Sequence, residues 1–287
     1  MSIEKPKIKI SAVPTKHLVG REDPKGGPHY DDIQKNILDN CAAGVPVCTL
    51  KPVLYDKRIA VVGYGPSLAH SWEEIKDYEV IWTCSKAHDF LIDRGIVPTY
   101  HTDVDFRTHK AKFNRAPHPD VTYVMSTQVH PDYVKFLHNA NVHYCHATVY
   151  NTKPYQYPGD YPKIPALWDA GQQCVKFAYE LGYKKQDWFG ISYSNYWQGS
   201  VPVEKHLGHD HAGPHEGFRA PTLYTLTNGK VFETSNAHLA ACFGVETMLN
   251  THPDLDVNIY SDGLLLNFLE ERAPQIQEQE TINAPSI

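Results

Sequence analysis

The sequence predicts an α/β protein with a Rossmann-like, mostly parallel sheet, helices on both faces of that sheet and long inserted loops. Two observations predict this class. From residue 57 onward, short apolar segments rich in β-branched residues alternate with segments of helical periodicity, a pattern typical of parallel sheets covered by helices. The 287-residue chain is also 41% hydrophobic, which is enough to bury a substantial core.

Seven segments are expected to form strands, because each is short, apolar and bounded by glycine, proline or polar residues. The first contains the continuous apolar run Ile59-Ala60-Val61-Val62, which is typical of a strand buried on both faces. The seven are Arg58–Gly63, Glu79–Cys84, Pro98–Asp103, Val121–Thr127, Val142–Ala147, Asp187–Ser192 and Val257–Ser261.

Four segments are expected to form helices, because their apolar residues recur at helical spacing. Asp169 and Asn236 can cap the starts of two of them, and Gly95 and Gly182 follow the ends of two. The four are Tyr30–Asn40, Lys86–Arg94, Asp169–Leu181 and Asn236–Asn250.

The chain divides by composition into three parts. Residues 1–52 are expected to form an irregular N-terminal arm, residues 53–272 the Rossmann-like domain, and residues 273–287 a polar tail. Within the domain, residues 148–168 and 193–235 lack clean periodicity and are predicted to be long loops. Loops of this length inside a compact domain are usually functional.

Composition and charge limit the classes of protein to which the chain can belong. No apolar run approaches the roughly 20 residues of a membrane span, and the first 16 residues contain no apolar block, so we expect a cytoplasmic protein without a signal peptide. Six cysteines without a C-x-x-C pair are expected to be reduced. The net charge of −6 does not favour nucleic acid as a partner.

A glycine turn, Gly63-Tyr64-Gly65-Pro66-Ser67-Leu68, follows the first strand directly. Ligands of open parallel sheets bind beyond the carboxyl ends of the strands, where glycines let the backbone approach an anion. We therefore predict that Gly63, Gly65, Pro66 and Ser67 bind phosphate. The alternative is a plain tight turn.

This turn and two further motifs carry a resemblance to a known family. The motifs are Arg94-Gly95-Ile96-Val97-Pro98 leading to Asp103, and Asp169-Ala170-Gly171 opening a helix that ends in Leu181-Gly182. Together they resemble the 6-hydroxymethylpterin diphosphokinase-like family, which includes motility-associated glycosyltransferases. The G-P-S-L turn is also similar to that of CMP-sialic-acid-dependent sialyltransferases.

The resemblance covers about residues 57–265 and implies that residues 53–272 are a nucleotide-binding transferase domain. Its glycine turn would hold the phosphates of a nucleotide or nucleotide sugar. Two departures leave the chemistry open. Tyr64 stands where the sialyltransferase turn has Asn, and Asn195–Phe232 has no close counterpart.

Two carboxylates end the third predicted strand, in His101-Thr102-Asp103-Val104-Asp105. Alternation places Asp103 and Asp105 on one side at the ligand-binding edge, and D-x-D pairs hold nucleotide diphosphates through Mg²⁺ or Mn²⁺ in many glycosyltransferases. The resemblance also places an acid at Asp103. The alternative is that one carboxylate caps a turn and the other is solvated.

The helix that begins at Asp169 should start at the same edge. In one interpretation Asp169 is the N-cap of this helix and has no other role. In the other it also contacts a nucleotide together with Gly171 and Gln172, because the small residues Ala170 and Gly171 permit close approach.

A histidine-rich stretch, Lys205–Gly217, can fold over this edge and is the most unusual part of the sequence, which has 17 histidines. We predict that His209 or His211, oriented by Asp210, acts as a general acid or base, with His238 as a second candidate. Zinc bound by His209, His211 and His215 is one alternative, and a solvated surface loop is another.

The leading prediction is a nucleotide-dependent transferase, and within that class a glycosyltransferase with a nucleotide-sugar donor. The alternatives are an ATP-dependent diphosphokinase acting on a pterin-like alcohol and a non-catalytic nucleotide-binding module. The acceptor is left open among a sugar, a small alcohol and a modified polymer, and so is the oligomeric state. Aromatic residues of the long loops, Tyr193 among them, can stack on a base or sugar or pack the loops onto the domain.

Overall fold

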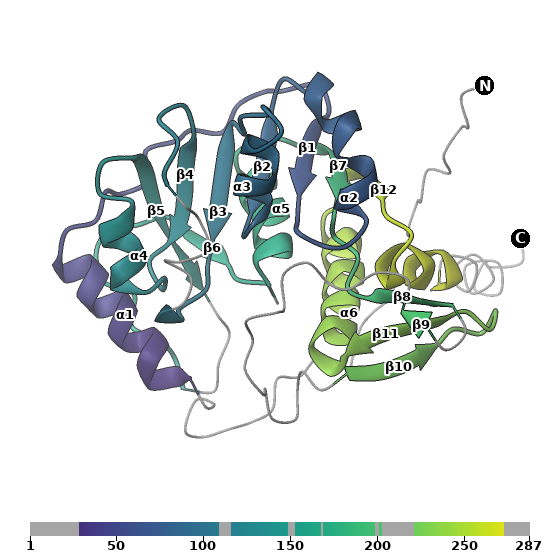
Figure 1. Ribbon diagram of the computed structural model, residues 1–287. Helices are drawn as coiled ribbons and strands as arrows, with labels where there is room; N and C mark the ends of the chain where they lie inside the picture. Colours follow the sequence, from purple (N-terminus) through teal and green to yellow (C-terminus); the bar gives the residue numbers. More distant parts are fainter. Residues whose placement is uncertain are drawn as a thin grey trace, which may run out of the picture.

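The computed structural model describes residues 29–108, 116–148, 153–167, 169–198, 201–202 and 221–272. A central sheet of eight parallel strands organises this part of the chain (Figure 1). The strands are β1 (Ile59–Val62), β2 (Ile81–Cys84), β3 (Tyr100–Asp103), β4 (Thr122–Ser126), β5 (Asn141–Thr148), β6 (Lys163–Pro165), β7 (Lys185–Phe189) and β12 (Asp256–Tyr260). All seven predicted strands are confirmed, and β6 is additional.

Helices cover both faces of the sheet, as predicted. Ile59 and Val61 of β1 share a core with residues of α5 (Ala170–Glu180) and α6 (Asn236–Thr251). Ala60 and Val62 point to the opposite face, against α2 (Leu68–Ser71), η1 (Trp72–Asp77) and α3 (Ala87–Ile92). The continuous apolar sequence of β1 is thus explained by burial on both sides.

The strands lie in the order β12-β7-β1-β2-β3-β4-β5-β6. All are parallel, but the side on which the chain adds successive strands changes at β1. The chain proceeds from β1 to β6 on one side and then crosses to β7 on the other side. Ligands of open parallel sheets bind at such a topological switch point, beyond the carboxyl ends of the strands. The position between β1 and β7 is therefore where a site is expected.

The prediction that residues 193–235 form a long loop is wrong in part. They contain a second, antiparallel sheet of β8 (Asn195–Gln198), β9 (Val201–Pro202), β10 (Pro221–Thr225) and β11 (Val231–Ser235). Strands β10 and β11 form a hairpin whose turn contains Asn228 and Gly229, the latter at φ 84°. Asn-Gly between strands is a strong hairpin signal, and it is independent of hydrophobic periodicity.

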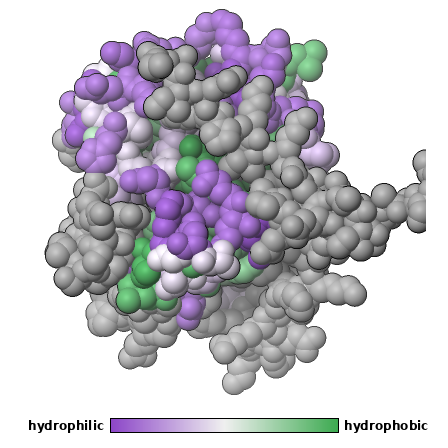
Figure 2. Space-filling view, turned by 90° about the vertical axis from the view of Figure 1, so that its right-hand side faces the viewer, coloured by the Kyte–Doolittle hydropathy of each residue, from purple (hydrophilic) through white to green (hydrophobic). Residues whose placement is uncertain are grey.

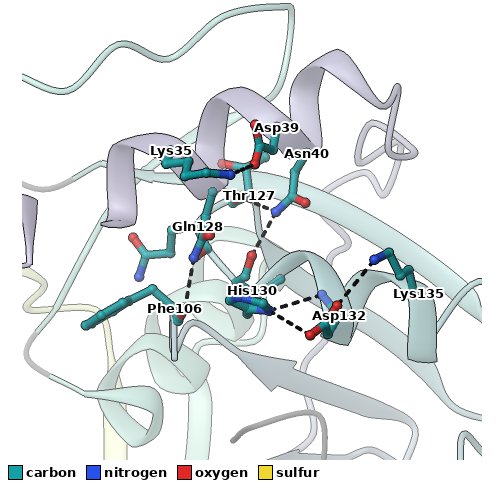
Figure 3. Close-up of polar contacts among 11 residues, drawn as sticks. Lys35, Asp39, Asn40, Phe106, Thr127, Gln128, His130, Asp132 and Lys135 are labelled. Carbon is teal, nitrogen blue, oxygen red and sulfur yellow. Dashed lines mark hydrogen bonds and ion pairs between the residues drawn. The ribbon is translucent and has the colours of Figure 1, made fainter. Parts of the chain in front are cut away.

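Helix α1 (Tyr30–Ala42) packs beside α4 (Pro131–Phe136), where β3 and β4 end (Figure 1). Asn40 donates to the carbonyls of Thr127 (2.9 Å) and Val129 (2.8 Å) in the loop after β4 (Figure 3). Asn36 donates to the carbonyl of Phe106 (2.9 Å) after β3. The helix predicted over Tyr30–Asn40 is therefore confirmed, and it supports two loops at the carboxyl edge of the sheet.

A last described helix covers residues 264–272. No helix in the described ranges is long and apolar enough to cross a membrane. All six cysteines are free thiols, as predicted.

Candidate functional site

Two tight turns meet where β1 and β7 end. The N–H of Gly63 donates to the carbonyl of Phe189 (2.8 Å), and the N–H of Gly65 donates to the carbonyl of Gly190 (2.7 Å). A Cβ atom on either Gly63 or Gly65 would lie 2.7 Å from the Gly190 carbonyl oxygen, closer than Cβ atoms approach in folded proteins. Close packing of two backbones therefore explains both glycines, and phosphate binding by them stays a prediction.

Pro66 and Ser67 are the other two residues of the glycine turn that were predicted to bind phosphate, and of these Ser67 has the polar side chain. Pro66 has no N–H to offer a phosphate, and its carbonyl accepts from Ala69 (3.1 Å). Ser67 is buried, and its hydroxyl shares a hydrogen bond of 2.9 Å with that of Ser192, which follows β7. Ser261, which follows β12, donates to the same Ser192 oxygen (2.9 Å). Three serine hydroxyls thus form a chain across the ends of β1, β7 and β12.

This serine chain borders a cleft of about 400 Å³. One wall carries His70 and Glu74, which follow the glycine turn, and the other carries Tyr260 and Asp262 at the end of β12, with Glu270 beyond them. The described lining residues include three carboxylates and neither lysine nor arginine. Figure 2 shows this side of the molecule, where hydrophilic residues predominate around smaller hydrophobic areas. The carboxylates that line the cleft suit ligands with hydroxyl or amino groups and disfavour phosphate.

At the end of β3, both predicted metal ligands are engaged in hydrogen bonds. Asp103 is 1% exposed, and its Oδ1 accepts from the N–H groups of Val104 (2.7 Å) and Asp105 (2.9 Å). The carboxylate of Asp105 accepts from Nε of Arg107 (2.8 Å) and pairs with its Nη2. The hydrogen bonds from Arg107 to Asp105 raise the pKa of Arg107, so this guanidinium is held charged at the edge of the sheet.

These contacts do not fit a metal site made by Asp103 and Asp105 alone. Mg²⁺ and Mn²⁺ bind carboxylate oxygens, and a cation between these residues would compete with the guanidinium of Arg107. In the ranges that the structure covers, no group of three His, Cys, Asp or Glu residues could hold a metal ion. The guanidinium of Arg107, rather than a metal, is therefore the partner that these contacts favour for Asp105, and the metal predicted from the sequence is untested.

At the start of α5, Asp169 caps the helix, as predicted, and accepts from the N–H of Gln172 (2.9 Å). Gln172 is 1% exposed, and its Nε2 donates to the carbonyl of Ala241 in α6 (2.7 Å). The side-chain amide of Gln172 therefore joins two helices, while Asp169 and Gly171 remain partly exposed at the edge. A nucleotide contact by these residues stays a prediction.

Tyr193 connects the start of α5 with His238 in the first turn of α6. Its hydroxyl lies beside Asp169 and Gln172, and burial together with the Asp169 charge raises the pKa of Tyr193 well above its usual value. Its ring centroid is 5.9 Å from that of His238. Tyr193 also has φ 58°, and strained conformations of this kind in non-glycine residues cluster at functional sites.

The structure thus brings many of the predicted residues to one region. The turn of Gly63, Gly65 and Ser67 and the residues Asp169, Gly171 and His238 all surround the loop that follows β7. Asp103 ends β3 and Asp105 follows it. Strand β3 lies two strands from β1, a separation of about 10 Å. The candidates His209, Asp210, His211 and His215 lie outside the described residues.

The sequence reasoning missed several polar residues that lie within four residues after the end of a strand. They are Lys86 after β2, Arg107 after β3, Ser192 after β7 and Ser261 after β12. The rule that applied to the glycine turn, that ligand-binding residues follow the strands of a parallel sheet, would have selected each of them.

A comparison of the sequence with known families bears on this region. Residues 34–192, more than half of the chain, match the family described as 6-hydroxymethylpterin diphosphokinase MptE-like. The chain belongs to this family. The region shared with the MptE-like family runs from α1 to Ser192, so it contains the glycine turn, the end of β3 and the loop that begins after β7.

Among solved structures, the chain is similar to the MAf glycosyltransferase from Magnetospirillum magneticum AMB-1, with 16% identity and a TM-score of 0.55. The likeness covers 83% of this chain and 37% of that protein, so this MptE-like chain spans little more than a third of the other's length. At this identity the likeness shows a shared fold. No curated protein matches the sequence.

Proposed function

We propose that the chain is a nucleotide-dependent transferase that transfers a sugar from a nucleotide-sugar donor to a hydroxyl acceptor. One observation carries the proposal. The glycine turn after β1, which contains Gly65, meets the loop after β7, which contains Ser192, at the topological switch point of the sheet. A cleft lined in part by hydroxyl groups lies beside them. Membership of a family named for a diphosphokinase supports group transfer, and the glycosyltransferase of similar fold supports the sugar donor.

Cationic side chains at the ends of neighbouring strands suit the donor phosphates. Lys86 follows β2 and Arg107 follows β3, and both strands lie on the same side of β1. A guanidinium binds phosphate oxygens in a bidentate manner, and an ammonium binds them as a point charge. In this proposal Lys86 and Arg107 neutralise the leaving phosphate.

The cleft beside β12 suits the part of a substrate that carries hydroxyl groups. Glu74, Asp262 and Glu270 accept hydrogen bonds from hydroxyls, and Ser67 and Ser261 can both donate and accept them. Phosphates toward β2 and β3, and hydroxyl-bearing groups toward β12, place the reacting sugar carbon near the end of β1.

The transfer breaks the bond between the sugar carbon and the donor phosphate oxygen and forms a bond from that carbon to the acceptor oxygen. The acceptor proton must leave, and His238, whose ring centroid lies 5.9 Å from that of Tyr193 in the loop after β7, is a candidate to accept it. His209 and His211, with Asp210, remain candidates for the same role. A positioned histidine contributes about 10²–10⁴-fold to such a rate.

The second candidate is diphosphate transfer from ATP to a pterin-like alcohol, which the name of the family favours. The two reactions release different products. A panel of nucleotide sugars and ATP, each with and without candidate acceptors, would release a nucleoside phosphate from a sugar donor in the first case and AMP from ATP in the second. If the protein binds nucleotides but turns over no compound of the panel, the result would favour the third alternative, a non-catalytic nucleotide-binding module.

The phosphate assignment has a separate test. Lys86→Ala and Arg107→Ala should each weaken the binding of the best nucleotide at least tenfold in calorimetry, because each removes a charge from the phosphate site. Lys35→Ala, which removes an exposed lysine of α1, is the matched control. Unchanged affinity in both folded variants would contradict the placement of the phosphates.

A further inference from the structure

The segment between α1 and β1 runs beside β5 for a few residues. Val47 and Tyr144 form a parallel bridge. The N–H of Cys48 donates to the carbonyl of Tyr144 (2.9 Å), and the N–H of Tyr144 donates to the carbonyl of Pro46 (2.9 Å). In this register the next residue of each segment, Cys48 and Cys145, lies on the same face of the sheet.

The two thiols are hydrogen-bonded to each other and differ in exposure. Cys48 is half-buried between exposed neighbours, whereas Cys145 is 1% exposed. The hydrogen bond from Cys145 lowers the pKa of Cys48 to about 7, with smaller contributions from the N–H of Leu50 and the charge of Lys51. The same pairing, together with burial, raises the pKa of Cys145. The lowered pKa gives Cys48 more thiolate, the nucleophilic form, at neutral pH than a cysteine of ordinary pKa has.

We propose that Cys48 is a site of oxidation by hydrogen peroxide and that Cys145 is its resolving thiol, so that the two form a disulfide. The Cys48 thiolate attacks one peroxide oxygen, the O–O bond breaks, and the departing hydroxide takes a proton to become water. The sulfur of Cys145 then displaces the hydroxyl group of the Cys48 sulfenic acid, and the Cys145 proton leaves with that hydroxyl as a second water. Two thiols are oxidised and one peroxide is reduced to two waters.

The chain contains its own control pair. The thiols of Cys84 and Cys174 are also hydrogen-bonded, but Cys84 is 3% and Cys174 0% exposed. Burial raises the pKa of Cys174 well above its usual value. Contact between thiols is thus common to both pairs, whereas access and thiolate character distinguish Cys48.

The disulfide would join the segment that leaves α1 to strand β5. Because α1 holds the loops after β3 and β4 through Asn36 and Asn40, the oxidation would fix the chain next to the helix that supports the carboxyl edge. The site lies outside the residues proposed for transfer, so it stands whether or not that proposal holds.

Peptide mapping of the full-length protein tests the proposal. The protein is treated with hydrogen peroxide at pH 7, alkylated, denatured and alkylated again with a heavier reagent. The expected product is one cross-linked pair of peptides, Cys48 with Cys145, lighter by two hydrogens, while Cys84 and Cys174 stay thiols. Sulfinic or sulfonic acid at Cys48 beside an unmodified Cys145 would overturn the proposal, and so would earlier oxidation of Cys84 and Cys174.

A pair of variants tests the hydrogen bond. Cys145→Ala removes the donor and should slow alkylation of Cys48 at pH 7 about tenfold, by the fall in its thiolate fraction. Cys145→Ser keeps a donor at the same position and should retain most of the rate, but should accumulate a Cys48 sulfenic acid that dimedone traps. Equal rates in the wild type and in Cys145→Ala would contradict the assigned role of Cys145.

Discussion

The carbonyl oxygen of Gly190 lies 2.7 Å from the amide nitrogen of Gly65 and accepts its hydrogen bond. This contact joins the turns after two strands that are far apart in sequence, β1 and β7, and leaves no room between them for a side chain. The glycine turn is therefore a packing element as well as a candidate ligand site, and substitutions there affect both properties.

Gly65→Ala should destabilise the protein by about 1–3 kcal/mol, the usual range for overpacking, because its Cβ would meet the Gly190 carbonyl and the Ser192 hydroxyl. Gly95→Ala is the control, since Gly95 has φ 76° but no atom within 4 Å of the added Cβ. Its cost should be confined to backbone strain, about 1 kcal/mol. Urea unfolding measures both, and a smaller loss for Gly65→Ala than for Gly95→Ala would contradict the packing argument.

The asparagines of α1 should contribute to stability in proportion to the buried carbonyls that they satisfy. Asn40→Ala leaves two carbonyls without their donor and should cost about 1–3 kcal/mol. Lys35→Ala removes only an exposed ion pair with Asp39 (Figure 3) and should cost under about 1 kcal/mol. Chemical denaturation compares the two, and equal losses would mean that α1 is held by its apolar face alone.

Turnover should survive chelation. Because Asp105 is paired with Arg107, we expect EDTA to leave the rate of transfer unchanged, and we expect Asp105→Asn to weaken donor affinity by releasing the guanidinium. Loss of activity in EDTA, with recovery on addition of Mg²⁺ or Mn²⁺, would instead restore Asp103 and Asp105 as metal ligands.

His238→Ala should lower turnover by about 10²–10⁴-fold if this side chain carries the proton. Donor affinity should change little, because a proton-transfer group acts mainly in the transition state. The same measurements on His209→Ala and His211→Ala decide whether His238 or the histidine-rich stretch carries the proton. A near-normal rate in His238→Ala, with a large loss in either loop variant, would assign the role to the histidine-rich stretch.

Stability should fall as the pH drops below about 6.5. His146 is 0% exposed and hydrogen-bonded to Thr127 and Pro158, and burial lowers its pKa. Between its folded and unfolded pKa values only the unfolded chain binds the proton, so the free energy of unfolding decreases with falling pH, by at most about 1.4 kcal/mol per pH unit for this group.

Urea unfolding at pH 7.5 and 5.5 measures this dependence. The variant His146→Gln should show a smaller difference between the two pH values than the wild type does. His138→Gln, which changes an exposed histidine, should keep the full difference. If His146→Gln keeps it as well, another group is responsible.

Most of the fold could be predicted from the sequence because its elements have strong local signals. The apolar run Ile59–Val62 marks a strand buried on both faces, and Asp169 marks the start of a helix that the structure also begins there. Hydrophobic periodicity does not predict the antiparallel sheet, although the turn residues Asn228-Gly229 mark its hairpin. Local signals thus sufficed for the central sheet and its helices.

The site was less predictable, because its geometry depends on contacts between distant segments. The G-x-G pattern indicated a turn, but only the structure shows that Gly190 is the neighbour that requires both glycines. Likewise, nothing in the D-x-D pattern indicates that Arg107 pairs with Asp105. The contact between Tyr193 and His238 depends on how α6 packs after β11.

The hydrogen bonds of α1 have a consequence for the order of folding. Asn36 and Asn40 reach carbonyls that lie 70 to 92 residues further along the chain, so closing these contacts requires β3 and β4 to be in place first. Helix α1 is therefore expected to dock after the rate-limiting step. Changes in its asparagines should accelerate unfolding and leave the refolding rate nearly constant, so that α1 governs the lifetime of the native state rather than the speed of its formation.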